Sequence, residues 1–396
     1  MQSTSRVEFV NTLRGLAAVT VLIGHYFGVF WMGREAVASL INAPILPIES
    51  IPTPTFIPLF HQFTHFNWGA YGVALFFIIS GFVIPFSLKR MTWDQFLFNR
   101  VFRIFPTYVI GFTITLTSLW ICSQYFLTEW IPSLKEVVIH YIPGLRDVMW
   151  SRNIDGIIWT LEIEIKFYII CALSIVWFRK DSLKVFFVPL MLWACSLWLS
   201  SYTTHWMSSS PEIYRQSMVF ICYSQYIIFM FVGVTIHYLY KGIFASKKAI
   251  LFGGGLFALF CILWFVGPYQ VSFPVVWNYA FALVTFLFAY VCPSLFRSNR
   301  LFDFFADISY PLYVIHGLPG YIVLRILIDK GMKTGLALIL VTTFAIVLSW
   351  LLHVIVETPF QTLGKALAKK LSIGPTPSVF KQIVLSYLRK RQSELG

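Results

Sequence analysis

The chain has 396 residues, of which 58% are hydrophobic, 18% are aromatic and only 12% are charged. A soluble globular domain is about half apolar and about a quarter charged, so the composition excludes that class and predicts a polytopic membrane protein. The formal net charge of +13 would favour nucleic-acid binding in a soluble protein, but in a membrane protein the location of the charge matters more.

Ten apolar stretches of about 20 residues are each long enough to cross a bilayer as a helix. We therefore expect an all-α bundle of about ten transmembrane helices. The predicted spans are 10–32, 68–88, 103–123, 156–177, 185–202, 216–239, 249–267, 275–293, 307–328 and 335–356.

The loops between these spans alternate in charge. With the N-terminus in the cytoplasm, the inner segments hold 20 Lys and Arg and the outer segments hold 7. The positive-inside rule therefore predicts that both termini are cytoplasmic. No clear internal repeat is present, which argues against a transporter built from duplicated halves. The first apolar run has no small-residue cleavage site, so we do not interpret it as a signal peptide.

The first span contains two polar residues, Arg14 and His25, at the ends of an apolar run. Eleven positions are almost three helical turns, so both side chains lie on one face, about 16 Å apart along the axis. An arginine in an apolar span usually faces the protein interior or a wet cavity. The alternative is that Arg14 extends to the interface and His25 only packs.

The two long loops and the tail carry weaker signals. The 33–67 loop is rich in Pro and contains His61 and His65, but with no third ligand nearby we expect no metal site. The 124–155 loop includes an apolar patch that fits an interfacial helix. The 361–396 tail is basic and is expected to attach to anionic lipid, apart from a membrane domain at 1–360. The six cysteines are scattered and are interpreted as small buried hydrophobes.

The third span begins FNRVFRIFPTY, with Arg100 and Arg103 on one face of a helix N-terminus. Backbone N–H groups there favour anions, and arginine forks bind phosphate well. We expect Arg14 to lie near the same membrane face, so that three arginines converge on one polyanion. Positive-inside anchoring is the alternative for the pair.

The fourth span carries Glu162, Glu164 and Lys166. Glu162 and Lys166 are four apart and are expected to pair, which leaves Glu164 without a local partner. Glu164 and His25 fall at similar depth, so a carboxylate that orients a general-base histidine is one arrangement the spacing permits.

The ninth span begins DISYPLYVIHG, and its cytoplasmic half contains Ser309, Tyr310 and His316. The helical rise places His316 about 14 Å into the membrane, beside a route from the arginines to His25. Glu357 follows in VETPF at the inner end of the last span.

The motifs NTLRGLAAVTVLIGHYF, FFIISGFVI, FNRVFRIFPTY, IIWTLEIEIKFY, DISYPLYVIHG and VETPF occur in one order between about 7 and 360. Together they resemble acyltransferase family 3, the bacterial integral membrane acyltransferases. The resemblance implies a ten-helix domain of the bacterial cytoplasmic membrane. It also implies transfer of an acyl group, usually acetyl from acetyl-CoA, to a hydroxyl of a carbohydrate or lipid-linked saccharide, with no tightly bound cofactor and no nucleic acid.

The family's signature residues match by position. Its Arg and His match Arg14 and His25, its RxxR motif matches Arg100 and Arg103, and the acid of its WSL-type motif matches Glu164. Its SYxLYxxH-type motif matches Ser309, Tyr310, Tyr313 and His316, whereas Thr160 stands in place of the serine of the WSL-type motif. Some members carry a fused extracytoplasmic domain; we expect none here, which leaves a place for a separate extracytoplasmic partner.

These residues predict a mechanism. The phosphates of acetyl-CoA lie on Arg14, Arg100 and Arg103, and the thioester reaches His25. The histidine, oriented by an acid such as Glu164, acts either as general base or as acyl carrier. A transporter or flippase for a glycan precursor, and a non-catalytic scaffold, are the alternatives from other classes.

Overall fold

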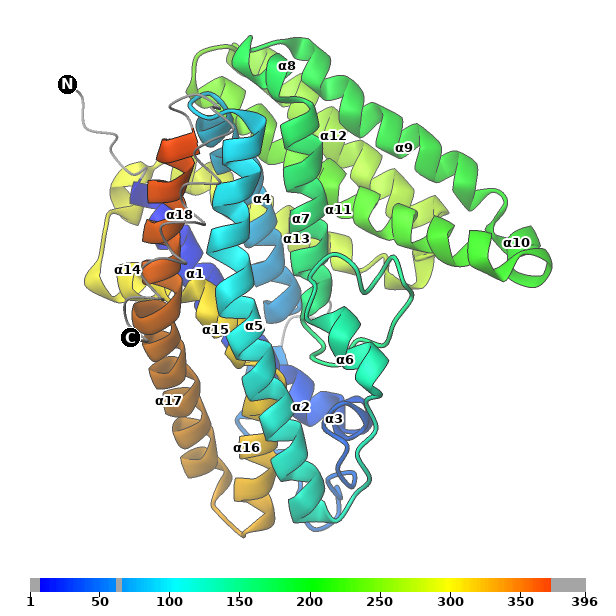
Figure 1. Ribbon diagram of the computed structural model, residues 1–396, viewed down its shortest axis with the longest axis vertical. Helices are drawn as coiled ribbons and strands as arrows, with labels where there is room; N and C mark the ends of the chain where they lie inside the picture. Colours follow the sequence, from blue (N-terminus) through cyan, green and yellow to red (C-terminus); the bar gives the residue numbers. More distant parts are fainter. Residues whose placement is uncertain (1–7, 62–65, 372–396) are drawn as a thin grey trace, which may run out of the picture.

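The computed structural model describes residues 8–61 and 66–371, and within these ranges every regular element is helical (Figure 1). The longer helices form a bundle. They are α1 (Glu8–Gly24), α4 (Trp68–Leu88), α5 (Trp93–Phe126), α7 (Ile158–Leu173), α9 (Phe187–Ser200), α11 (Pro211–Tyr240), α12 (Ser246–Val266), α13 (Val275–Val291), α16 (Leu318–Asp329), α17 (Thr334–Leu352) and α18 (Thr358–Leu371). The shorter helices are α2 (Phe30–Met32), α3 (Arg34–Ile41), α6 (Leu134–His140), α8 (Ile175–Arg179), α10 (Thr203–Ser209), α14 (Arg300–Asp307) and α15 (Ser309–Ile315).

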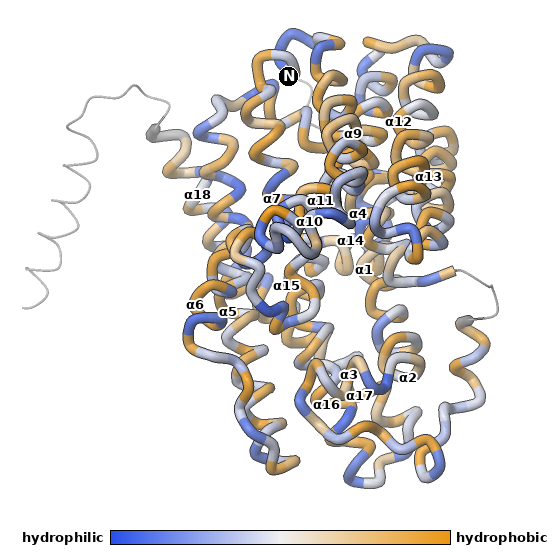
Figure 2. Tube along the Cα trace, turned by 90° about the vertical axis from the view of Figure 1, so that its right-hand side faces the viewer, coloured by the Kyte–Doolittle hydropathy of each residue, from blue (hydrophilic) through white to orange (hydrophobic). Residues whose placement is uncertain are grey.

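Within the described residues, seven helices are long and apolar enough to cross a membrane, and the bent pair α15–α16 makes up to eight. α13 is as apolar but has only 17 residues. Hydrophobic residues predominate along the long helices, and hydrophilic residues gather at their ends (Figure 2). The all-α polytopic membrane fold is therefore confirmed. Each of the ten predicted spans overlaps a helix, but the number ten and the cytoplasmic termini stay predictions.

The predicted span 307–328 is broken rather than continuous. α15 and α16 are bent by 55° at His316 and Gly317. Pro319 explains the break, because it has no N–H to donate to the carbonyl of Ile315 and its ring would clash with that carbonyl. His316, at the C-terminal end of α15, is therefore buried in the bundle, and α16 leaves it in a different direction.

Helix α4 lies at the centre of the bundle and packs against α1, α11 and α13. Two glycines permit its closest approach to α11. A Cβ on Gly81 would lie 1.9 Å from the Met230 carbonyl oxygen, and one on Gly233 would lie 2.3 Å from the Ile78 carbonyl oxygen. Small residues at such crossings let two backbones touch in a membrane, where packing rather than water exclusion holds helices together.

Two of the described membrane-spanning segments contain one turn of π-helix. The first, His25–Val29, follows α1 directly, and the second, His353–Glu357, follows α17. π-helical turns are frequent at functional sites because they change the direction in which side chains leave the helix. Both turns contain residues of the family-like motifs, His25 and Glu357.

The described parts of the two long loops contain short helices and internal hydrogen bonds. Arg34 is buried and donates hydrogen bonds to the carbonyl oxygens of Leu46 and Ile51 and to the Thr53 hydroxyl, so it fastens the Pro-rich loop to α3. The 124–155 loop contains α6, where the apolar patch predicted a helix. His65 and residues 372–396 lie outside the described residues, and α18 runs across the expected domain boundary at 360. All six cysteines are unpaired.

Candidate active site

Helix α15 connects the candidate residues of four elements. The Arg14 side chain of α1 donates a hydrogen bond to Ser309 Oγ (3.1 Å). The Tyr310 hydroxyl donates to the Ile104 carbonyl of α5 (2.9 Å), and the Tyr313 hydroxyl donates to the Ile157 carbonyl at the start of α7 (2.8 Å). Ser309, Tyr310 and Tyr313 therefore each bind a different helix, and α15 sets their relative positions.

A cavity with about 750 Å³ of open space lies between α1, α4, α5, α7 and α15, and we call it the arginine cavity. Its charged lining residues are Arg14, Arg103 and Glu164, so cations outnumber carboxylates. Ser309 and Tyr310 also line it. The structure thus brings together five of the eight site residues that the sequence predicted.

Arg100 is close to the arginine cavity but is not among its lining residues. Its guanidinium lies 5.1 Å from the ring centre of Phe96 and 5.2 Å from that of Tyr168, and it donates a hydrogen bond to Ser87 Oγ. Tyr168 lines the cavity, so Arg100 stands behind one of its walls. Of the three arginines expected to converge, two face the cavity directly.

Glu164 has local partners, contrary to expectation. Its carboxylate accepts hydrogen bonds from Ser80 Oγ of α4 (2.9 Å) and from the Tyr168 hydroxyl one turn further along α7. Within the described residues, Glu164 and His25 share neither a hydrogen bond nor a cavity. The expected direct orientation of His25 by Glu164 is therefore corrected: helical depth placed both residues at one level, but their side chains point into different cavities.

His25 lies on a second cavity with about 430 Å³ of open space, which we call the histidine cavity. Its Nδ1 is hydrogen-bonded to the Tyr321 hydroxyl of α16, and its ring meets the His316 ring edge-on, with ring centres 4.5 Å apart. His316 is 1% exposed, and its Nδ1 is paired with the Leu312 carbonyl, whereas its Nε2 has no partner. The break between α15 and α16 is what places His316 beside His25.

A thin wall separates the two cavities. Thr160 and Tyr313 line the arginine cavity, and Ile157 lines the histidine cavity. The Tyr313 hydroxyl is hydrogen-bonded to Thr160 Oγ1 as well as to the Ile157 carbonyl, and its ring centre lies 5.7 Å from that of His316. A molecule that spans both cavities has to pass this hydrogen-bonded group.

Sequence reasoning missed Asp155, which lines the histidine cavity. Asp155 Oδ1 accepts the backbone N–H groups of Ile157 and Ile158 and so caps α7, and Oδ2 accepts the Tyr108 hydroxyl (3.2 Å). An Asp three positions before the first residue of an apolar helix is a capping signal that the sequence shows, but the sequence does not show that Asp155 lies beside His25.

The Tyr108 hydroxyl continues the chain of polar contacts from Asp155 to His140 Nδ1 (2.7 Å). His140 Nε2 accepts the Ile154 N–H (3.1 Å), which assigns the ring proton to Nδ1. Burial lowers the pKa of His140 below its usual 6.5, and the positive charge of Arg146 lowers it further, although Asp155 opposes the shift. The histidine cavity is thus supported by a neutral buried histidine.

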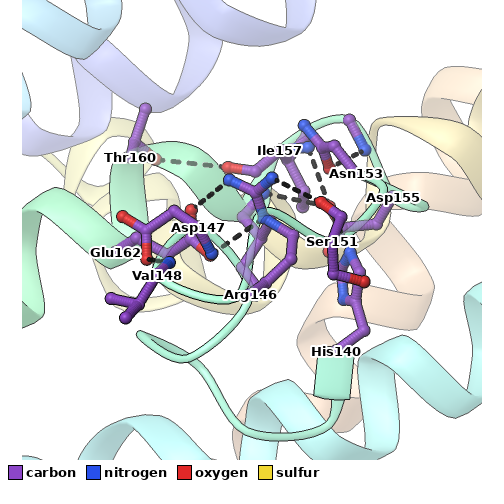
Figure 3. Close-up of polar contacts among 12 residues, drawn as sticks. His140, Arg146, Asp147, Val148, Ser151, Asn153, Asp155, Ile157, Thr160 and Glu162 are labelled. Carbon is purple, nitrogen blue, oxygen red and sulfur yellow. Dashed lines mark hydrogen bonds and ion pairs between the residues drawn. The ribbon is translucent and has the colours of Figure 1, made fainter. Parts of the chain in front are cut away.

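The expected pairing of Glu162 with Lys166 is wrong. The Arg146 side chain donates to both carboxylate oxygens of Glu162, and Lys166 pairs with Asp147 (Figure 3 shows Glu162 beside Arg146 and Asp147). Arg146 and Asp147 are neighbours in the loop before α7 and have opposite charges. Each forms an ion pair with the α7 residue of opposite charge. An arginine fork binds a carboxylate with two parallel hydrogen bonds, which a lysine four residues away on the same helix cannot offer.

Within the described residues, no group of three His, Cys, Asp or Glu side chains is placed to bind a metal ion. The polar groups instead form an anion-favouring cavity next to a histidine-containing one. This arrangement can hold a long molecule with a negatively charged end and a reactive end.

Comparison with known proteins gives one match. A family model described as an acyltransferase domain, that of acyltransferase family 3, matches residues 7–354, which is nearly the whole chain. No curated protein and no solved structure matches the chain significantly.

Proposed function

The chain belongs to acyltransferase family 3, and from this membership we propose that it transfers an acetyl group from cytoplasmic acetyl-CoA to a hydroxyl of a cell-surface carbohydrate or lipid-linked saccharide. A multi-pass membrane acyltransferase is what the family and the apolar helices establish. The donor, the acceptor, the side of entry and the bacterial cytoplasmic membrane are the proposed part.

The pairing of a cationic cavity with a histidine cavity carries the proposal. The phosphates of acetyl-CoA would bind Arg14 and Arg103, with Arg100 adding charge from behind Tyr168. Arginine forks complement phosphate oxygens, and a cavity with more cations than carboxylates favours a polyanion. Glu164 would accept hydrogen bonds from the amide N–H groups of the pantetheine arm.

The thioester would pass Tyr313 and Thr160 and arrive at His25. With its Nδ1–H held by the Tyr321 hydroxyl, His25 would take the proton of the acceptor hydroxyl on Nε2. The acceptor oxygen bonds to the acyl carbon, the carbon–sulfur bond breaks, and the proton on His25 passes to the leaving thiolate. His316 Nδ1–H donates to the Leu312 carbonyl, so the buried Nε2 is a hydrogen-bond acceptor and would stabilise the imidazolium. A covalent acyl-histidine is the alternative course for the same residue.

Purified protein in detergent tests the function. Acetyl-CoA with a candidate acceptor should release free thiol at a rate that depends on the acceptor concentration, and the acceptor should gain the mass of one acetyl group. A transporter or flippase with the same polar cavities would bind ligands without releasing thiol, and that outcome would replace the proposal.

A further inference from the structure

A third cavity, apart from the eight site residues that the sequence predicted, opens between α7, α11 and the loop before α7. It has about 640 Å³ of open space, part of which is continuous with the solvent. Four aromatic side chains line it, and we call it the aromatic cavity. They are Trp150, Trp159, Tyr223 and Tyr269.

The charged residues that line the aromatic cavity take part in two ion pairs. Arg146 pairs with Glu162, and Asp147 pairs with Lys166, which also lies 5.3 Å from the ring centre of Tyr223. The Glu162 carboxylate is only 2% exposed. Buried ion pairs cost desolvation energy, so they are weak evidence for stability, and a role in recognition gives a reason for their presence here. Lys166 does not itself line the cavity, so the lining residues Arg146, Asp147 and Glu162 carry a net charge of −1, in contrast to the cationic lining of the arginine cavity.

Trp150 lines this cavity in a backbone conformation that is energetically unfavourable. Its φ is +49°, a left-handed conformation that is unfavourable for a bulky side chain, and 46% of its surface is exposed. Arg146 fixes this conformation, because its Nη1 donates to the Ser151 carbonyl (3.2 Å) while Ser151 N–H donates to the Arg146 carbonyl. Figure 3 shows Arg146 between Glu162 and Ser151. The residue that pairs with the buried carboxylate therefore also positions the exposed ring.

Flat aromatic faces with alternating donors and acceptors suit one ligand class in particular. The C–H faces of a sugar ring pack on aromatic rings, and its hydroxyls both donate and accept hydrogen bonds, as the ion-paired groups require. A phosphorylated ligand gains nothing from a lining without net positive charge, and a lipid tail would exclude water from the ion-paired groups without offering them a hydrogen bond.

We propose that the aromatic cavity binds a neutral saccharide unit of the acceptor, an inference that rests on the proposed acyl transfer to a carbohydrate. The 146–157 segment connects this cavity to the chemistry. Trp150 and Ser151 line the aromatic cavity, and Asp155, Gly156 and Ile157 line the histidine cavity. A chain of sugars seated on one side of this segment would present a neighbouring unit to His25 on the other.

Calorimetric titration of the purified full-length protein tests the site, with cellotriose and triacetylchitotriose as neutral probes and glucose 1-phosphate as an anionic one. We expect at least one neutral trisaccharide to bind, and Trp150→Ala and Tyr223→Ala each to weaken its binding at least about tenfold. Trp130→Ala is the matched control, because Trp130 lies in the same loop with 45% of its surface exposed and lines a different cavity. It should leave binding unchanged.

The outcomes separate this inference from the proposed function. Absence of binding of both trisaccharides to the wild type, an equal loss in Trp130→Ala, or tighter binding of glucose 1-phosphate would overturn the saccharide site. During turnover, Trp150→Ala should raise the acceptor KM with kcat and acetyl-CoA affinity unchanged. An unchanged acceptor KM alongside acceptor-dependent thiol release would refute this site while leaving the acyltransferase activity established. Trp150-dependent trisaccharide binding without any thiol release would support the site and refute the transfer.

Discussion

The arginine cavity and the histidine cavity lie on either side of one hydrogen-bonded wall, yet their linings differ in kind. The arginine cavity has two guanidinium groups, one carboxylate and several hydroxyls. The histidine cavity combines His25 and Asp155 with apolar side chains of α3, such as Val37 and Leu40. One lining provides charge that attracts an anion, and the other provides a titratable ring with little competing charge.

This contrast separates binding from chemistry. An anion is gripped most strongly where cations outnumber carboxylates, whereas a general base works best as a neutral ring without strong ion pairs around it. If both tasks shared one cavity, the guanidinium groups would oppose protonation of the histidine. The wall of Tyr313, Thr160 and Ile157 keeps the two environments apart, so substitutions on each side should affect different kinetic quantities.

The largest expected effect concerns which cavity faces which compartment. With 20 basic residues in one set of loops and 7 in the other, we expect the 33–67 loop outside and the 241–248 loop in the cytoplasm. In intact cells, an impermeant thiol reagent should label Glu35→Cys completely and Lys247→Cys not at all, with the wild type as background because it has six cysteines. The reverse pattern would exchange the donor and acceptor sides.

Removal of the base should cost the most activity. His25→Ala should lower kcat by about 10²- to 10⁴-fold, the usual contribution of general acid–base catalysis, without changing acetyl-CoA affinity, because His25 does not line the arginine cavity. Thiol release and titration calorimetry measure the two quantities. The exposed His205→Ala is the control and should be fully active. Retained turnover in His25→Ala would end the proposed role of this histidine.

Lysine at the donor site should weaken binding rather than chemistry. Arg103→Lys and Arg14→Lys keep the charge but lose the planar fork, and a lost charge-assisted hydrogen bond costs about 1.5–3 kcal/mol, or roughly tenfold to hundredfold in acetyl-CoA affinity. Arg100→Lys should lose less, since Arg100 does not line the cavity. Calorimetry on proteins of equal thermal stability checks this, with the exposed Arg90→Lys as control. Wild-type affinity in the Arg103→Lys variant would reduce that arginine to a membrane anchor.

Weakening the wall should couple the cavities. Tyr313→Phe removes the hydroxyl that binds Thr160 and Ile157, at a net cost of about 1 kcal/mol, so acceptor-independent thiol release should rise about fivefold while acetyl-CoA affinity stays unchanged. Tyr310→Phe is the matched control, because its hydroxyl binds the Ile104 carbonyl away from the histidine cavity. An equal rise of acceptor-independent thiol release in both variants would show that Tyr313 is not part of a barrier between the cavities.

The smallest expected effect is a pH dependence of stability due to His140, which lies behind Asp155 of the histidine cavity. Because burial depresses the pKa of His140 below 6.5, the contribution of its neutral form to stability is complete above about pH 6.5 and is lost as the pH falls toward the folded-state pKa. The slope is at most about 1.4 kcal/mol per pH unit for one proton. As the pH is lowered from 7.5 to 5, the midpoint temperature of thermal unfolding should fall more steeply for the wild type than for His140→Gln. A steeper fall in the variant would contradict this assignment.

The patterns within single segments were sufficient for much of this molecule. Apolar runs located the helices, because a backbone in lipid must satisfy its own hydrogen bonds and only long apolar helices can do so. The helical spacing placed Arg14, Arg103, Ser309 and Tyr310 toward one face of the membrane domain, and all four line the arginine cavity. Such statements need only the helical repeat and the cost of burying charge.

What depends on the packing between segments was not accessible in this way. The spacing of Glu162 and Lys166 determines which face of α7 they share. The Glu162 carboxylate nevertheless pairs with Arg146 of the preceding loop, because a guanidinium group can donate two parallel hydrogen bonds. The helical rise placed His25 and Glu164 at the same depth in the membrane, but depth does not specify the direction in which a side chain points around the helix axis. The π-helical turn at His25 also alters the direction of its side chain. The wall between the two cavities consists of residues more than 150 positions apart. Helical periodicity orders side chains around one axis, whereas the meeting of two axes depends on the summed contacts of the whole bundle.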